Sequence, residues 1–355
     1  MLAPLVTRIS EPQQGGSQAL VADLAVGLTA RGHDLDVFAA SGSVIDGARV
    51  IDTGVDAREL AVALHRPGVP RTAHPAVAEA FELAFRAIEE GGYDVVHSHG
   101  FDPPALRRSR AGRARVIHTV HLPPEPEAAA ALIEARSGTP PALVVGVSAS
   151  QARAWRSLVT FDRVIRNGVP VERIPWSAAE GSGLIFAGRL SPEKGAREAV
   201  EIALRAGQEI DVYGDAYDAD YARDLEARFR DASGVRFHRP VPRPELWGHL
   251  ARARAVLCPI DWEEPFGLGA AEAHAAGTPV VGFARGGLTE VVADGITGFL
   301  VEPGNIAAAV AAVSLVGAID RRACRQHALD HLNMETCVAG YEELYASVAA
   351  LRQTQ

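Results

Sequence analysis

The 355-residue sequence has few cysteines, a single lysine and no long apolar run. Cys258, Cys324 and Cys337 are odd in number and lack the close spacing of zinc or redox sites, so a disulfide scaffold is not expected and a reducing cytoplasm fits best. The longest nearly apolar stretch, residues 306–318, is shorter than the roughly 20 residues that a membrane-spanning helix needs. No N-terminal signal pattern is visible. We therefore expect a cytoplasmic protein without a transmembrane segment.

Positive charge is also scarce. The chain has 35 Lys and Arg against 44 Asp and Glu, a formal net charge of −9, which gives no general attraction to nucleic acid or anionic lipid. We expect no nucleic-acid partner. Lys194 is the only lysine, and every other long cationic side chain is Arg. Apart from chance, this exception indicates a position that requires a compact ammonium group rather than a planar guanidinium.

Short runs rich in Val, Ile and Phe alternate along the chain with longer Ala-, Leu-, Glu- and Arg-rich stretches of helical period. This alternation is typical of α/β proteins with parallel sheets. A turn-forming, small-residue linker at 170–182 separates two such halves. We expect two Rossmann-like, doubly wound domains, 1–169 and 183–333, that face a central cleft. An apolar stripe in 334–355 predicts a last helix that packs on another element, and a return to the first domain is one option.

The first predicted strand, Leu2–Val6, feeds a glycine loop. Gly15 and Gly16 precede a long predicted helix, so the backbone can approach a ligand there and the helix start favours a phosphate oxygen. An ordinary turn is the alternative. The loop lacks the GxGxxG spacing of a dinucleotide site, which argues against a nicotinamide-dependent dehydrogenase.

A second loop, with the sequence GRLSPEKG over residues 188–195, follows the first strand of the second half. Ser191 is expected to cap the helical turn that Pro192 begins. Arg189 and Lys194 would converge at this strand end. A guanidinium fork and a mobile ammonium together suit a diphosphate. Solvated surface charge is the alternative.

The most specific stretch is EPFGLGAAEAHAAGTPVV over residues 264–281. Gly267 and Gly269 remove side chains from a helix start, so its N–H groups can be reached. Glu264 stands before that helix, and Glu272 lies one to two turns inside it. Such carboxylates suit the hydroxyl groups at two ends of a ligand whose middle is anionic. A glycosidase acid and nucleophile are a possible second interpretation, but the adjacent anion site argues against a free sugar.

Here the sequence resembles the family 4 glycosyltransferases, which are retaining, nucleotide-sugar-dependent enzymes of the GT-B fold. The resemblance rests on residues 264–281, on GGLTEVVADGITGFL at 286–300, and on motifs spread over nearly the whole chain. These motifs are the loops at Gly15 and Arg189 described above, RGH at 31–33, DVVHSH at 94–99, TVH at 119–121, VS at 147–148 and NGV at 167–169.

The resemblance implies roles for individual residues. Arg189 and Lys194 would hold the donor diphosphate. Glu264 would face the transferred sugar, and His121 would touch that sugar near the reacting centre. The residues that bind the rest of the donor, through backbone groups or through the ribose hydroxyls, would be Gly15, Gly16, Phe266, Gly267, Leu268, Gly269 and Glu272. The histidines that would line the acceptor side are His97 and His99.

The activity implied is transfer of a hexose-type sugar from a nucleoside diphosphate sugar, a UDP- or GDP-sugar, to a hydroxyl acceptor with retention. The two substrates would be the small-molecule partners, and neither a cofactor nor a metal site is expected. Asp218 and Asp220 resemble the DxD of metal-dependent transferases, but their place before a helix favours a solvated cap. The alternatives are a sugar-nucleotide epimerase of the same fold and a non-catalytic sugar-nucleotide-binding protein.

Two departures from the family pattern concern specificity. Pro240 stands where relatives often have Gly in the loop that contacts the base, so the path of that loop and the identity of the base stay open. Residues 42–74 follow no pattern that we can assign. Because first-domain loops face the acceptor in this architecture, we expect this region to carry acceptor specificity.

Overall fold

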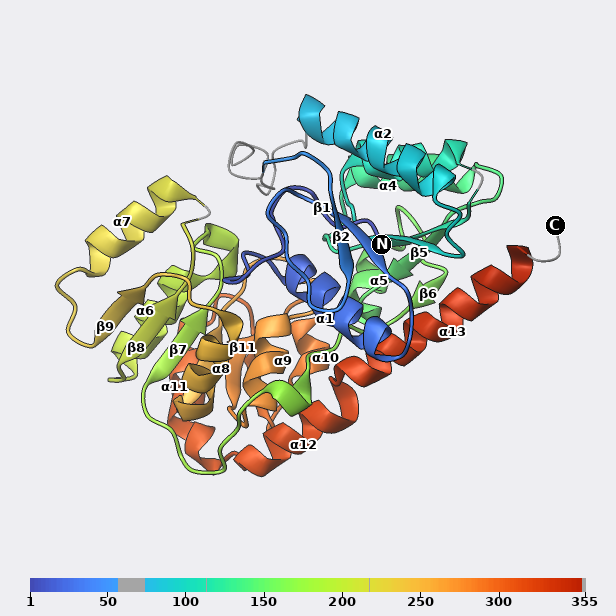
Figure 1. The fold of residues 1–355 in the computed structure, drawn as a ribbon. Coiled ribbons are helices and arrows are strands. Elements are labelled where there is room, and N and C mark those ends of the chain that lie inside the picture. Colours follow the sequence, from blue (N-terminus) through green and yellow to red (C-terminus); the bar gives the residue numbers. More distant parts are fainter. Residues whose placement is uncertain (57–73, 113, 217, 353–355) are drawn as a thin grey trace. The chain divides into compact units, whose positions relative to one another are not determined.

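The computed structural model describes residues 1–56, 74–112, 114–216 and 218–352. It divides into an N-terminal unit, Met1–Asn167 with Met334–Gln355, and a C-terminal unit, Gly168–Asn333. Both units consist of parallel strands connected by helices (Figure 1). The α/β parallel-sheet architecture expected from the sequence is therefore confirmed. No helix in the described part of the chain combines the length and the apolar character that crossing a membrane requires.

The N-terminal unit has a four-stranded parallel sheet in the order β3-β4-β5-β6 and a parallel pair β1-β2. Its strands are β1 (Asp36–Ala39), β2 (Arg49–Asp52), β3 (Val96–Ser98), β4 (Val116–Thr119), β5 (Leu143–Gly146) and β6 (Arg163–Val164). Its helices are α1 (Gly16–Ala30), α2 (Pro75–Glu90), α3 (Pro103–Arg108), α4 (Pro126–Arg136), α5 (Ala149–Trp155) and α13 (Met334–Arg352).

The predicted strand Leu2–Val6 is wrong in extent. Only Leu2 forms bridges, one to Phe38 of β1 and one to Ser98 of β3. Pro4 has no N–H to continue the ladder, and the chain turns at Leu5. The short segment nevertheless joins β1 to β3 through Leu2, whose side chain is fully buried.

The last helix, α13, belongs to the N-terminal unit. It runs alongside α1, as Figure 1 shows. Arg31 at the end of α1 donates to Glu342 at 2.5 Å and to Glu335 at 2.7 Å. The apolar stripe predicted from the sequence is buried at Val338, Tyr341 and other positions, so packing of this face rather than surface ion pairs stabilises the contact.

The C-terminal unit has a six-stranded parallel sheet in the order β12-β11-β10-β7-β8-β9. Its strands are β7 (Leu184–Ala187), β8 (Ile210–Tyr213), β9 (Val235–His238), β10 (Ala255–Cys258), β11 (Val280–Phe283) and β12 (Gly298–Val301). Its helices are α6 (Ala196–Arg205), α7 (Ala219–Phe229), α8 (Arg243–Arg252), α9 (Leu268–Ala275), α10 (Leu288–Val291), α11 (Ile306–Leu315) and α12 (Arg321–His331).

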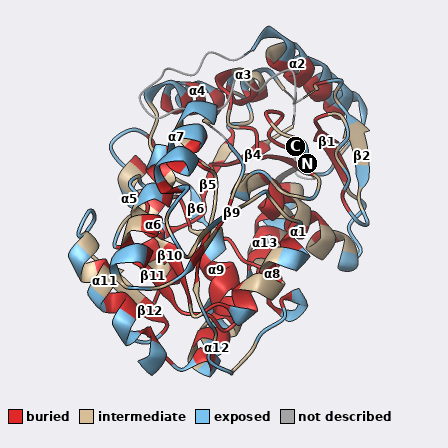
Figure 2. Cartoon of the chain, turned by 90° about the vertical axis from the view of Figure 1, so that its left-hand side faces the viewer, coloured by how far each residue is buried: buried red, intermediate tan, exposed pale blue. Residues whose placement is uncertain are grey.

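The core of this sheet lies under α6, α7 and α11, whose apolar residues form one buried cluster with the strands. Helices α8, α9 and α12 contact one another, and α9 is coloured as buried along most of its length in Figure 2. Burial on all sides explains why α9 consists largely of alanine, since small side chains let neighbouring elements approach.

The segment expected to be a linker, 170–182, is counted with the C-terminal unit. Val171 and Ile174 are buried, and both of their carbonyl groups accept hydrogen bonds from Arg325 of α12. Backbone groups tied to a buried guanidinium cannot behave as a free linker. The boundary between the two units falls between Asn167 and Gly168, close to the end of the first domain expected at residue 169.

Candidate functional site

The start of α9 has the backbone geometry that the sequence predicts. Gly267 precedes the helix with φ of 104°, a conformation that side chains with a Cβ rarely adopt. Phe266 as a whole is 2% exposed, so its ring lies in the core. The first turn of an α-helix leaves N–H groups without intrahelical partners, and the glycines at 267 and 269 leave them approachable.

A glycine pair from the next βα connection holds this loop in place. A Cβ at Gly286 would lie 2.5 Å from the backbone of Glu264, and one at Gly287 would lie 2.6 Å from Cα of Phe266. The N–H of Gly287 also donates to the carbonyl oxygen of Glu264 at 2.6 Å. The glycines at 286 and 287 are therefore explained by the close approach of two backbones, which fixes the path of Glu264.

Glu264 is held by two donors on one oxygen. Its Oε2 accepts from Lys194 Nζ at 2.6 Å and from Trp262 Nε1 at 2.7 Å. The ammonium of Lys194 also lies 4.7 Å from the centroid of the Trp262 ring. Lys194 is positioned by the turn that Gly195 ends, where φ is 77° and a Cβ would lie 2.0 Å from the carbonyl oxygen of Pro259. The structure thus brings Lys194 and Glu264, which lie in two separate loops of the sequence, into direct contact.

The electrostatics of this group favour ionised side chains. Burial alone would raise the pKa of Glu264, but the charge of Lys194 and the hydrogen bonds from Lys194 and Trp262 outweigh it and lower the pKa. Neighbouring Cys258 responds in the opposite direction, because burial and the charge of Glu264 raise the pKa of its thiol to about 12. Glu264 is therefore a carboxylate at neutral pH, and Cys258 is a protonated thiol without nucleophilic character.

Arg189 joins the same group through the indole ring. Its guanidinium carbon lies 5.7 Å from the ring centroid of Trp262, and its Nη2 lies 3.5 Å from Glu193. The predicted cap at Ser191 is wrong, because the Ser191 hydroxyl donates to the buried carboxylate of Glu193 at 2.7 Å instead of accepting from the backbone. Trp262 thus contacts both cations, a role that sequence reasoning missed because an indole in a loop has no distinctive spacing.

Arg243 is a second residue that sequence reasoning missed. Its Nε donates to Oε1 of Glu272 at 2.9 Å, and its Nη2 lies 2.8 Å from the same oxygen. Both side chains are nearly buried, and the Arg243 guanidinium lies 5.0 Å from the ring centroid of Trp247. No hydrogen bond to the other oxygen, Oε2, is recorded among the described residues. Sequence reasoning missed this pair because an Arg 29 positions before a Glu forms no recognisable motif.

The aspartates that resemble a metal-binding DxD cap a helix. Oδ1 of Asp218 accepts from the backbone N–H of Asp220 at 3.1 Å and of Tyr221 at 3.0 Å, at the start of α7. Asp220 is exposed and pairs with Arg223. The cap interpretation is therefore confirmed for Asp218. In the part of the chain that the structure describes, no group of three or more His, Cys, Asp or Glu residues is arranged to hold a metal ion.

In the N-terminal unit the predicted histidines form one cluster. Nδ1 of His99 lies 2.9 Å from Nε2 of His121, and His97 lies between Thr119 at 2.7 Å and Tyr345 at 2.6 Å. His97 is 2% exposed and His99 is fully buried, and their place on the acceptor side stays a prediction. Only His121 is partly exposed. Packing between β3, β4 and α13 accounts for the difference.

The glycine loop of the N-terminal unit starts α1 as predicted. Gly15 is the residue before the helix and makes no side-chain cap, and Gly16 is the first helical residue. A Cβ at Gly15 would lie 2.6 Å from Oε1 of Gln18, which accepts from the Ser17 hydroxyl. Of the region 42–74, which we expected to carry acceptor specificity, residues 57–73 lie outside the described residues.

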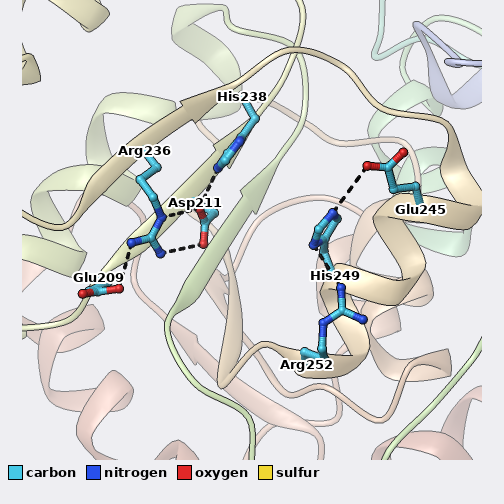
Figure 3. Close-up of polar contacts among 7 residues, drawn as sticks. All are labelled: Glu209, Asp211, Arg236, His238, Glu245, His249 and Arg252. Carbon is cyan, nitrogen blue, oxygen red and sulfur yellow. Dashed lines mark hydrogen bonds and ion pairs between the residues drawn. The ribbon is translucent and has the colours of Figure 1, made fainter.

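The C-terminal unit has a hollow of about 420 Å³ at the amino ends of β7 and β8, beside the end of α8. Its charged side chains are engaged with one another, as Figure 3 shows: Arg236 contacts Glu209 and Asp211, and His249 contacts Arg252. The predicted donor-binding residues follow the carboxyl ends of strands instead. Because parallel sheets bind ligands at the latter edge, this hollow does not contribute to the candidate site.

Two sequence families match the chain in consecutive segments. Residues 14–173 match the family described as Glycosyltransferase Family 4, and residues 177–327 match the family described as Glycosyl transferases group 1. A D-inositol 3-phosphate glycosyltransferase of Geodermatophilus obscurus is 30% identical over 395 residues, with 96% of this chain and 87% of the relative covered. A glycogen synthase of Mycobacterium tuberculosis is 28% identical over 391 residues, covering 96% and 93%.

Solved structures show the same fold at lower identity. Sucrose-phosphate synthase from Thermosynechococcus elongatus superposes with a TM-score of 0.78 at 19% identity, over 99% of this chain and all of that one. The Anabaena protein HepE in complex with UDP-glucose superposes with a TM-score of 0.74 at 20% identity, over 98% and 100%. These neighbours confirm the fold class that the sequence predicts.

Proposed function

Because the chain belongs to the family 4 glycosyltransferases of the GT-B fold, we propose that it moves a hexose-type sugar from a nucleoside diphosphate sugar to a hydroxyl acceptor, with retention of anomeric configuration. The observation that carries the proposal is the group formed by Arg189, Lys194, Glu264 and Trp262 near the glycine-flanked start of α9. Two cations and free backbone amides beside an ionised carboxylate suit a ligand with an anionic middle and a polyhydroxy end.

The diphosphate would be bound by cations and amides together. Arg189 offers a planar fork and Lys194 a compact point charge, while the first-turn N–H groups of α9 add a positive helix end. Without ligand, the ammonium of Lys194 is already paired with Glu264. Diphosphate binding would draw Lys194 toward the phosphate oxygens and leave Glu264 to accept hydrogen bonds from the sugar.

The nucleoside would be recognised further along α9. Arg243 engages one oxygen of Glu272, so the other oxygen is available to accept from a ribose hydroxyl. A carboxylate held on one side by a guanidinium keeps its charge and its direction while it accepts on the other. We propose a UDP- or GDP-sugar as the donor. One structural neighbour was solved in complex with UDP-glucose.

The chemical step would take place on one face of the sugar. The bond between the anomeric carbon and the leaving phosphate oxygen breaks, and a bond from the same carbon to the acceptor oxygen forms. The acceptor proton passes to the departing diphosphate oxygen. Arg189 and Lys194 stabilise the charge that grows on that diphosphate, and Glu264 orients the sugar without a covalent intermediate.

In the N-terminal unit we assign Gly15 and Gly16 the approach to the diphosphate, and His121 a contact with the donor sugar. Burial lowers the pKa of His121 to about 3, so its ring is neutral at pH 7 and acts as a hydrogen-bond partner rather than a cation. The reaction would proceed without a metal ion, because two cations and helix amides can neutralise the leaving group.

The test combines substrate screening with stereochemistry. The protein is incubated in EDTA with UDP-, GDP-, ADP- and TDP-glucose and a panel of polyol and sugar acceptors, and proton NMR reports the anomeric configuration of the product. We expect transfer from one donor class with retention. Inversion, or activity only after a divalent ion is restored, would overturn the corresponding part of the proposal. Donor incubated alone distinguishes the epimerase alternative, which would produce an epimerised nucleotide sugar.

A further inference from the structure

The partly exposed His121 is hydrogen-bonded to His99, a buried histidine whose second ring nitrogen makes no hydrogen bond among the described residues. Nδ1 of His99 and Nε2 of His121 are 2.9 Å apart, their ring planes differ by 17°, and the ring centroids are 5.2 Å apart. A short nitrogen-to-nitrogen distance with nearly parallel planes means that the rings meet edge to edge in an in-plane hydrogen bond. The other nitrogen of His99, Nε2, is buried and has no hydrogen-bond partner among the residues that the structure describes.

This geometry limits where the two protons reside. Burial lowers the pKa of both rings, so each is neutral and carries a single N–H. One ring must donate and the other accept. If His121 donated, His99 would accept at Nδ1 and carry its own proton on the partnerless Nε2. If His99 donates from Nδ1, that buried nitrogen is only an unused acceptor.

Buried N–H groups without a partner are rarer than buried acceptors without one. The second arrangement is therefore favoured. His99 donates from Nδ1, and His121 accepts at Nε2 and keeps its proton on Nδ1. No hydrogen bond to Nδ1 of His121 is recorded within the described residues.

The ring of His99 is held in register by its neighbour. The centroids of His97 and His99 are 4.0 Å apart. His97 is fixed in turn by Thr119 and Tyr345, and Tyr341 of α13 bonds to Thr119 at 2.9 Å. His99 therefore has little freedom to rotate away from His121.

We propose that His99 is a positioning residue that fixes the tautomer of His121, so that His121 presents an N–H donor rather than a lone pair to the substrate. The proposal deepens the function proposed above, because it rests on His121 as the residue that meets the donor sugar. A neutral donor at Nδ1 can hydrogen-bond to a hydroxyl oxygen of the sugar and hold the sugar in place, but it cannot take a proton from a hydroxyl group through that nitrogen.

The test uses two substitutions at one position and a matched control. His99→Asn keeps an amide N–H near the place of Nδ1, whereas His99→Leu removes the donor. His118→Leu is the control, because His118 is equally buried but bonds to Ser109 and not to His121. Nitrogen-15 NMR of protein with labelled histidine reports which nitrogen of His121 carries the proton, and a His121→Asn protein identifies the resonance.

We expect the Nδ1–H form of His121 in the unsubstituted protein and in His99→Asn, and a mixture of tautomers in His99→Leu. Turnover should fall roughly tenfold to a hundredfold in His99→Leu, recover in His99→Asn and change little in His118→Leu. An Nε2–H form of His121 in the unsubstituted protein would overturn the proposal, as would equal losses in all three variants. If His99→Leu does not fold, the spectra of the unsubstituted protein and of His99→Asn still show which nitrogen of His121 carries the proton.

The spectrum is recorded without substrate, so its outcome does not depend on the proposed function. The expected tautomer combined with no transfer from any donor would reject the function and leave the hydrogen-bond assignment standing. Sugar transfer by a protein whose His121 carries its proton on Nε2 would support the proposed function and reject the hydrogen-bond assignment.

Discussion

The two units place different chemistry at the ends of their strands. In the N-terminal unit the polar residues are neutral, buried histidines that hydrogen-bond to one another and to α13. In the C-terminal unit they are ionised pairs, Lys194 with Glu264 and Arg243 with Glu272. Charged groups suit a diphosphate and neutral donors suit sugar hydroxyls. Under the proposed function, the C-terminal unit would supply binding energy for the diphosphate and the N-terminal unit would orient the sugar.

The largest expected difference between the units is their response to acid. Burial lowers the pKa of four histidines in the N-terminal unit, which are His97, His99, His118 and His121. Among the described residues of the C-terminal unit, burial lowers the pKa of one histidine, His274. Because the unfolded chain binds these protons with a pKa near 6.5 and the folded chain does not, their stabilisation is complete above about pH 6.5 and is lost as the pH falls below it.

Each such histidine lowers the free energy of unfolding by up to about 1.4 kcal/mol for every pH unit below about 6.5. The N-terminal unit should therefore open first between pH 6.5 and 5. Hydrogen exchange measured by mass spectrometry at several pH values, corrected for intrinsic rates, follows the two units separately. His118→Asn should reduce the acid sensitivity of the N-terminal unit. Simultaneous opening of both units would contradict the comparison.

The next largest effect concerns the only lysine. Lys194→Met should lower transfer roughly a thousandfold, since one preorganised group at a developing charge is typically worth 100- to 1000-fold and this one also holds Glu264. Steady-state kinetics measures the loss. Arg197→Met removes an exposed cation three residues away and should leave the rate nearly unchanged. An equal loss of transfer rate in Lys194→Met and Arg197→Met would show that Lys194 acts only as general surface charge.

A smaller effect is expected at Arg243. Arg243→Met should raise the donor KM about tenfold to thirtyfold with a modest change in kcat, because Glu272 loses the guanidinium that directs it. In a Glu272→Gln background the same substitution should add little. Additive effects in this double-mutant cycle would show that Arg243 acts independently of Glu272.

The smallest effect is expected at the DxD-like pair. Asp218→Ala should cost about 1 kcal/mol of stability through the lost cap of α7 and leave the transfer rate intact. Thermal unfolding and kinetics of the same preparation test both statements. Loss of activity in Asp218→Ala, restored by added Mn²⁺ or Mg²⁺, would show that the ionised groups of the C-terminal unit include a metal ligand.

Much of the fold could be predicted from the sequence, because hydrophobic periodicity marks strands and helices locally. The predicted alternation of short apolar runs with helical stretches is found, for example, in β7, α6 and β8. The first strand could not be predicted correctly, since its partners lie tens of residues away and Pro4 interrupts the ladder. The hydrogen bonds within residues 170–182 could not be predicted for a similar reason, because Arg325, which binds the carbonyl groups of Val171 and Ile174, is about 150 residues distant in sequence.

The candidate site was predictable where backbone conformation is encoded by glycine. Gly195 and Gly267 have the positive φ angles that their motifs require. Trp262 and Arg243 were not predictable, because an indole between two cations and a guanidinium behind a carboxylate depend on tertiary contacts. The burial of His97 was missed because Tyr341 and Tyr345 of α13, which pack against it, are more than 200 residues away.

The proposed function requires that Lys194 and its neighbours in the C-terminal unit bind a diphosphate. Isothermal titration of UDP, UMP, GDP and GMP into the unsubstituted protein and into Lys194→Met measures this binding. We predict that one diphosphate binds at least tenfold more tightly than its monophosphate, and that the difference disappears in Lys194→Met. Equal binding of mono- and diphosphates, or an unchanged preference without Lys194, would contradict the claim.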